Sequence, residues 1–211
     1  MLPRCVRLGG HAVTIVDLGR CTSDAIVPAA NGASWAQRFE GLATAPVSAT
    51  RRLFFSENAA QTQFFITVDG QTPRVFDPTN PPDVITTQGS VEEWTIENRA
   101  QENHEFHFHQ LHFLVQSQDN FEVNGSPKVP TIQGQFLDMI EIPFWDGNTN
   151  HPYPSVRLRI DFRGPDIGDF VYHCHILNHE DQGMMAIIRV LPQSSAAQVD
   201  RASGVSANEG H

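Results

Sequence analysis

Residues 170–185 read F-V-Y-H-C-H-I-L-N-H-E-D-Q-G-M-M and place several metal-binding side chains in one short segment. The apolar residues around its first three metal-type side chains predict a core-like β-strand that carries His173, Cys174 and His175. Successive side chains of a strand point to opposite faces of the sheet. We therefore expect the two histidines on one face and the cysteine on the other, so that one peptide segment serves two metal sites.

A second stretch, residues 104–113, reads H-E-F-H-F-H-Q-L-H-F and repeats this arrangement. If residues 106–115 form one strand, His107 and His109 share a face of it. The apolar residues expected to follow on that face are Leu111, Phe113 and Val115. His104 has the opposite parity and stands at the start of the strand, so we expect it to belong to a different site.

Cys174 and His104, with two residues that follow the predicted strand, fit a known type of metal site. One thiolate, two imidazoles and a weakly bound thioether form the ligand set of blue-copper electron-transfer sites. The residues that match this set are His104, Cys174, His179 and Met184. Gly183 suits a tight backbone approach just before the methionine. Structural zinc is the main alternative, but the usual Cys-x-x-Cys pairs are absent and zinc would leave the thioether without a role.

The remaining histidines of the two stretches form an all-imidazole set on the opposite face. They are His107, His109, His173 and His175. Imidazole binds copper, zinc, iron or nickel, so this set alone does not identify the metal.

The rest of the chain predicts an all-β fold. Short segments rich in aromatic and β-branched residues alternate with turn residues and show little helical periodicity. The predicted strands are 53–55, 64–68, 91–96, 104–115, 139–142, 156–162, 170–175 and 186–191. This pattern predicts an antiparallel β-sandwich or Greek-key barrel.

Composition divides the chain into three parts. Residues 1–50 are expected to be the end of a preceding domain or a linker, residues 51–193 the β-domain, and residues 194–211 a disordered tail. Cys5 and Cys21 could pair across a loop, but nothing in the sequence requires it.

Charge and hydropathy argue against two kinds of partner. Lys and Arg number 14 against 24 Asp and Glu, a formal net charge of −10 without any basic run, so nucleic acid is not expected as a partner. No apolar run reaches membrane-spanning length, and residues 1–20 lack the charged start and apolar middle of a signal peptide.

Taken together, residues 104–113 and 173–185 resemble the two C-terminal copper motifs of the multicopper oxidases, the laccase-like family. The similarity covers roughly residues 51–192, which would be the last cupredoxin domain of a three-domain enzyme. The resemblance implies a cupredoxin-like Greek-key fold and copper as cofactor. It also implies an oxidoreductase that takes electrons from a small-molecule reductant, such as phenols or metal ions, and reduces O2 to water. A periplasmic or extracellular location follows from the same resemblance.

The resemblance also implies a role for each residue. The type 1 copper, which accepts electrons from the reductant, would be held by His104, Cys174, His179 and Met184. The type 2 copper would take His107, and the type 3 pair would take His109, His173 and His175. Electrons would pass from Cys174 along its neighbouring peptide units to His173 and His175. Glu180 resembles the acid that helps to deliver protons to bound oxygen, and the alternative is an ordinary exposed acid.

The chain departs from the family pattern at two positions near the ligands. Glu105 stands where the family usually has proline, and Gln110 stands where a glycine commonly follows the third histidine. Both changes spare the ligands and affect the shape of the loop. A larger departure is that the family's trinuclear centre takes histidines from an N-terminal domain as well, and those His-x-His pairs are missing here.

Three arrangements would account for the missing histidines. We favour the C-terminal part of a longer oxidase, whose N-terminal cupredoxin domains complete the cluster. The second is a separate subunit that completes the cluster with another polypeptide. The third is a type 1 copper electron-transfer protein without oxidase activity. The chain has no methionine-rich insert, which favours an organic reductant over cuprous ions.

Overall fold

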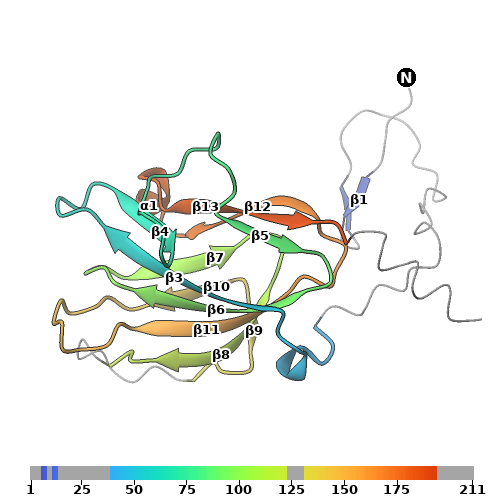
Figure 1. Cartoon of the computed structure of the whole chain (residues 1–211), viewed down its shortest axis with the longest axis horizontal. Helices are drawn as coiled ribbons and strands as arrows, with labels where there is room; N and C mark the ends of the chain where they lie inside the picture. Colours follow the sequence, from blue (N-terminus) through green and yellow to red (C-terminus); the bar gives the residue numbers. More distant parts are fainter. Residues whose placement is uncertain (1–5, 9–10, 14–38, 123–130, 194–211) are drawn as a thin grey trace, which may run out of the picture. The chain divides into compact units, whose positions relative to one another are not determined.

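The computed structural model describes residues 6–8, 11–13, 39–122 and 131–193 (Figure 1). The chain divides into two compact units, Met1–Ser34 and Trp35–His211. In the first unit, strands β1 (Val6–Leu8) and β2 (His11–Val13) pair in antiparallel fashion. The second unit carries both stretches of metal-type residues.

One sheet of this larger unit contains both of those stretches. It has five strands, in the order β10-β7-β12-β13-β5. Their bounds are β5 (Val84–Thr87), β7 (His104–Phe108), β10 (Met139–Ile142), β12 (Gly168–Cys174) and β13 (Met185–Leu191). The short helix α1 (Leu177–Asp181) connects β12 to β13. Because β7 and β12 are neighbours, the two histidine-rich stretches lie side by side.

The other sheet has six strands, in the order β4-β3-β6-β11-β8-β9. Their bounds are β3 (Ala49–Glu57), β4 (Phe64–Val68), β6 (Val91–Asn98), β8 (Phe113–Asp119), β9 (Phe136–Leu137) and β11 (Ser155–Asp161). The pair β3–β6 is parallel, and so is the pair β13–β5 of the first sheet. The predicted all-β sandwich is confirmed, but its pairing is not antiparallel throughout, because each sheet contains one parallel pair.

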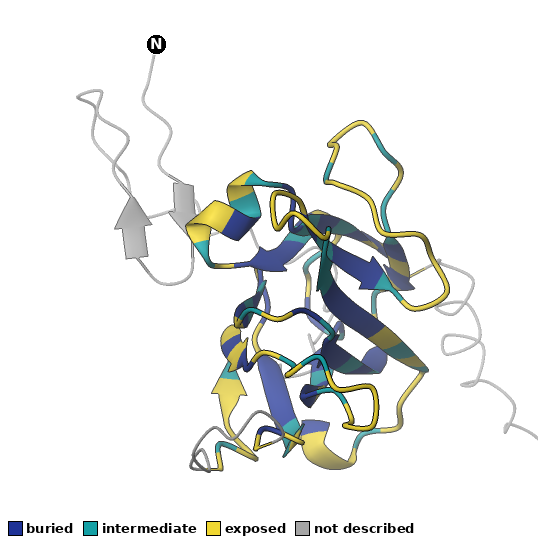
Figure 2. Cartoon of the chain, turned by 90° about the vertical axis from the view of Figure 1, so that its left-hand side faces the viewer, coloured by how far each residue is buried: buried dark blue, intermediate teal, exposed yellow. Residues whose placement is uncertain are grey.

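The two sheets pack face to face around one hydrophobic core. Trp94 of β6 meets Tyr172 of β12 with ring centroids 5.5 Å apart, and Phe106 of β7 meets Phe113 of β8 at 5.9 Å. Burying a large apolar side chain contributes about 1.5–3 kcal/mol, so these aromatic contacts hold the sheets together. Figure 2 shows buried residues along the strands and exposed residues in the loops.

The predicted single strand over residues 104–115 is wrong. Strand β7 ends at Phe108, and β8 begins at Phe113 in the opposite sheet. Between them Gln110 has a φ of +62°, which turns the chain. The residues expected to share a face with His107 and His109 instead point into the core, namely Leu111, Phe113 and Val115.

Residues 39–50 pack against the larger sheet ahead of the predicted domain start. The 3₁₀ helix η2 (Leu42–Thr44) places Leu42 against Val91 and Leu114. The amide of Phe39 donates a hydrogen bond of 2.8 Å to Asp161. The predicted division at residue 51 stays a prediction. The predicted tail and the two thiols Cys5 and Cys21 lie outside the described residues.

Candidate metal centre

Three buried donor atoms converge where the interior strand β7 begins and the neighbouring strand β12 ends. The Nδ1 atoms of His104 and His179 lie 3.0 Å apart, and each lies 3.7 Å from Cys174 Sγ. The three residues come from three elements: the first residue of β7, the last residue of β12, and α1. Two imidazoles and a thiol within reach of one point form a group that could hold a metal ion. We call them the thiol group.

Met184 is tied to the thiol group through its backbone. Its amide donates to the carbonyl of His179 at 3.0 Å, and its carbonyl accepts from the amide of Cys174 at 3.0 Å. The Met184 side chain is fully buried. The short turn after α1 therefore returns the chain to Cys174 and His179 within a few positions.

In the metal-free protein, burial controls whether the Cys174 sulfur and the His104 ring carry a proton. It raises the pKa of Cys174 to about 11, although the amide of Glu105 donates to Sγ at 3.4 Å. Burial, with His179 beside it, lowers the pKa of His104 to about 3. At neutral pH His104 is thus uncharged with a lone pair available, whereas a bound metal must displace the thiol proton.

Glu102 contacts the thiol group and was not among the residues predicted from the sequence. Its Oε2 lies 2.9 Å from His179 Nε2, on the side of the ring away from Cys174. An Nε2–H donated to this carboxylate leaves the Nδ1 lone pair facing the thiol group. Phe64 stacks on the same ring, with centroids 4.2 Å apart. The only sequence signal was an acid two residues before a candidate ligand, which by itself is not specific.

The second group contains imidazoles only, and we call it the imidazole group. The residues brought together are His107, His109 and His173. The Nε2 atoms of His109 and His173 lie 3.0 Å apart, and His107 Nδ1 bonds to the carbonyl of Asp138 at 2.8 Å. Burial and the neighbouring histidines lower the pKa of His109, so this ring stays neutral and able to bind metal.

His175 lies at the edge of the imidazole group. Its ring centroid is 5.1 Å from that of His107 and 5.7 Å from that of His173. The residue is exposed, just beyond the end of β12, whereas His173 is buried. The structure thus places the fourth predicted imidazole beside His107 and His173, but outside the group whose donor atoms converge.

Glu180 faces the imidazole group from α1. Its Oε2 lies 3.2 Å from His173 Nδ1, an atom that also lies 2.9 Å from the carbonyl oxygen of Cys174. The opposite nitrogen of the His173 ring points toward His109. A carboxylate in this place can hold a proton or orient His173.

Strand β12 connects the two groups. In its pairing with β7, His173 lies opposite His107 and Cys174 lies opposite Phe106. Since adjacent residues of a strand face opposite sides, His173 joins the imidazole group and Cys174 joins the thiol group. The opposite placement predicted from the sequence is confirmed.

The fold and the two groups define a class: an all-β, cupredoxin-like sandwich with a donor set suited to copper. A family model described as multicopper oxidase matches residues 45–194. The chain belongs to the multicopper oxidase family.

Individual relatives agree with this assignment. The chain is 31% identical over 129 residues to multicopper oxidase mco of Staphylococcus aureus, a match that covers 59% of this chain and 24% of that protein. It is 32% identical over 109 residues to a laccase of Bacillus stratosphericus, covering 46% of this chain and 20% of that protein. The matches thus span about a quarter or less of the length of these relatives.

A solved structure shares the fold. The multicopper oxidase from Campylobacter jejuni, described as a metallo-oxidase, superposes with a TM-score of 0.53 and 22% identity. The match covers 71% of this chain and 31% of that chain. Among the described residues, no helix is long and apolar enough to cross a membrane.

Proposed function

We propose that this chain supplies the type 1 copper site and half of the trinuclear centre of a laccase-like multicopper oxidase. The observation that carries the proposal is the pair of donor groups joined through adjacent residues of one strand, His173 and Cys174. A thiolate with imidazoles suits a copper that exchanges single electrons, and a set of imidazoles suits further copper ions. Bound copper would supply the one-electron oxidation of the reductant and the reduction of O2 to water.

The residues of the thiol group hold and shield the type 1 ion in this proposal. His104, Cys174 and His179 would provide the donor atoms, and the buried thioether of Met184 would add a weak fourth ligand. All of these side chains are buried, so the protein excludes water and fixes the ligands before the ion arrives. The hydrogen bond from His179 Nε2 to Glu102 orients the His179 ring so that its Nδ1 faces Cys174.

The residues of the imidazole group provide half of the second centre. We assign His107 to type 2 copper and His109, His173 and His175 to the type 3 pair. Glu180, within 3.2 Å of His173, is the candidate acid that moves protons to bound oxygen. The short link between the groups comprises one peptide unit and the contact of 2.9 Å between His173 Nδ1 and the carbonyl oxygen of Cys174.

The other half of the trinuclear centre would come from outside this chain. The relatives are about four times longer than the matched region, which supports additional cupredoxin domains or a partner subunit. The reductant would be a phenol or a metal ion, and the site of action periplasmic or extracellular. Cell fractionation with an antibody against the chain tests the location, and finding it only in the cytosol would refute it.

A single-copper electron carrier is the second candidate. It is favoured by the contrast between the fully buried donors of the thiol group and the exposed His175 at the edge of the imidazole group. Copper per chain, visible and EPR spectra, and O2 consumption discriminate the candidates. Further coupled copper with O2 uptake, after the missing domains are supplied, supports the oxidase. One blue copper without O2 uptake supports the carrier, and binding of zinc but not copper refutes both.

A further inference from the structure

The chain approaches Gly183, the residue before Met184, unusually closely. Gly183 has a φ of +102°, and a Cβ at this position would lie 1.9 Å from Val75 Cγ1. The carbonyl of Gly183 also accepts a hydrogen bond of 3.1 Å from the amide of Phe76. Residues 74–83, which we call the strap, thus press against the backbone that leads into Met184.

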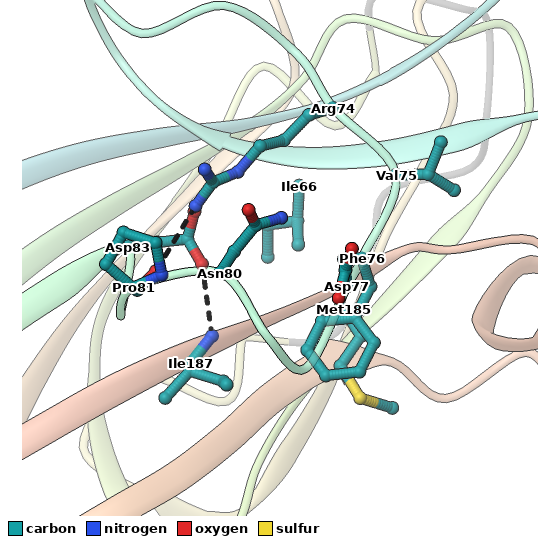
Figure 3. A pocket seen from close by; sticks show the side chains of 10 residues that line it. All are labelled: Ile66, Arg74, Val75, Phe76, Asp77, Asn80, Pro81, Asp83, Met185 and Ile187. Atoms are coloured by element: carbon teal, nitrogen blue, oxygen red, sulfur yellow. Dashed lines mark hydrogen bonds and ion pairs between the residues drawn. The ribbon is translucent and has the colours of Figure 1, made fainter.

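The two ends of the strap are joined to each other, and the Asp83 end is bonded to β13. Arg74 forms an ion pair of 2.6 Å with Asp83, which closes the strap on itself. The amide of Asp83 donates to the carbonyl of Ile187 at 2.9 Å, and Asp83 Oδ2 accepts from the amide of Ile187 at 3.2 Å. Figure 3 shows Arg74 and Ile187 on opposite sides of the Asp83 carboxylate, both joined to it by dashed lines. The strap is therefore fixed to β13 just after Met184.

Little space separates the strap from the sheet. The cavity between them has a volume of about 10 Å³, which is room for at most one water molecule. Met185 and Ile187 of β13 line this cavity together with residues of the strap. This close packing and the hydrogen bond from Phe76 to Gly183 together hold the strap against the turn.

Met184 is thus held between two sets of contacts. On one side its backbone bonds to His179 and Cys174, and on the other side the strap meets Gly183. The backbone of a weak ligand needs such support, because the metal–thioether interaction is too weak to position the side chain alone.

We propose that the strap, through Val75 and Phe76, positions Met184 as the axial ligand and so sets the reduction potential of the thiol-group copper. This inference rests on the proposed function, since it requires a type 1 copper at Cys174. Loosening the strap lets the turn at Gly183 relax away from the thiol group. A more weakly held thioether donates less to Cu(II), so the potential rises.

Val75→Ala tests the proposal in the full chain loaded with copper. Val75 is 38% exposed, so its truncation is expected to disturb stability little. We expect a higher reduction potential, a several-fold shift of the Cu(I)/Cu(II) ratio toward Cu(I) at fixed ambient potential, and a changed EPR hyperfine splitting. In the metal-free protein, amide hydrogen exchange of residues 182–185 is expected to become faster.

Two control variants separate positioning from general loosening. Val75→Thr keeps the branched shape against Gly183 and should match the parent potential. Val156→Ala removes the same atoms from a fully buried valine of the other sheet, so it should lower stability without moving the potential.

Phe76→Pro is a second strap variant, because proline cannot donate the hydrogen bond to Gly183. We expect it to shift the potential in the same direction as Val75→Ala.

The outcomes distinguish this inference from the proposed function. A blue parent protein with shifted potentials in both strap variants, but in neither control, supports the strap. Unchanged potentials in Val75→Ala and Phe76→Pro, or an equal shift in Val156→Ala, overturn it and leave the copper site standing. A parent chain without a blue copper signal overturns the proposed function itself, and the strap inference with it.

Discussion

The carboxylate of Glu102 contacts the thiol group directly, through its hydrogen bond with His179. The carboxylate side chain is 38% exposed, and its Oε2 lies 2.9 Å from the ring nitrogen. A negative charge at this distance makes the imidazole a stronger donor and favours Cu(II) over Cu(I). The carboxylate therefore lowers the reduction potential of the proposed copper site.

The variant Glu102→Gln keeps the length and an acceptor oxygen but removes this charge. We expect the affinity for Cu(II) to fall about tenfold and the reduction potential to rise, while the blue absorption remains. Redox titration and competition with a copper chelator measure the two effects. Asp169→Asn removes a charge that pairs with Arg189 of β13 and lies at the opposite end of β12 from Cys174. An equal shift in this control would show that only net charge matters.

His104 makes the stability of the metal-free protein depend on pH. Its folded pKa is about 3, below the unfolded value of 6.5, so between these values the unfolded chain binds more protons than the folded one. The stabilising contribution is fully present above pH 6.5 and is lost as pH falls toward 3. The loss is on the order of a few kcal/mol.

Urea unfolding of the metal-free protein at pH 7, 6, 5 and 4 checks this expectation. The free energy of unfolding should decrease along the series, and His104→Phe should reduce the slope because this position then no longer titrates. The same slope in the variant and the parent would assign the effect to other groups.

At the scale of elements, the turn between α1 and β13 depends on Gly183. In Gly183→Ala the new Cβ would meet Val75 Cγ1 at 1.9 Å, and the φ of +102° disfavours any side chain. We expect a loss of about 3 kcal/mol in the free energy of unfolding and weakened copper binding.

Gly168→Ala is the matched control for this substitution. Gly168 has a similar φ of +109°, but a Cβ there meets nothing within 4 Å. Its cost should be only the backbone penalty of about 1 kcal/mol, with copper affinity preserved. Chemical denaturation and copper titration of both variants give the comparison. Equal losses of stability would exclude the collision with Val75 as the cause.

The sequence predicts most strands of the two sheets, including the short β4 and β10, but misses three short elements and most of the length of β3. The predicted strand 156–162 corresponds to β11, and the predicted strand 64–68 has the same bounds as β4. Strand β5 was missed because its sequence, V-I-T-T, does not alternate as its burial does. Strand β9 has only two residues, and the five residues of α1 cover little more than one helical turn, so neither shows a hydrophobic period. The break at Gln110 was missed because its positive φ is imposed by the crossing between sheets and not by a glycine.

At the scale of the whole molecule, parity within two segments predicts which candidate ligands share a group. His104 and Cys174 are distant in sequence, yet their strands pair and both face the same side. The contacts of Glu102 and Val75 were not predictable in this way. Each comes from a loop whose place is set by packing against distant residues, and no local pattern encodes such a meeting.

The two donor groups are expected to bind metal separately. Cys174→Ser should abolish the blue absorption and remove about one copper per chain, since the hydroxyl is a poor ligand for this site. Burying that hydroxyl costs about 1–3 kcal/mol. Copper bound by the imidazole group should remain.

His109→Asn provides the converse variant. It should weaken copper binding by the imidazole group and keep the blue absorption. Metal analysis with visible and EPR spectra records both variants. Loss of all copper in either one would contradict separate binding.

The alternation along β12 also limits how this gene can change. Removing or adding one residue between Tyr172 and His175 would exchange the faces of every side chain beyond that point, so the sulfur would move among the imidazoles and an imidazole would take its place. Insertions and deletions in this strand would therefore damage both groups at once. We expect length variation among natural relatives to be confined to connecting loops, with the His-Cys-His tripeptide inherited as a unit.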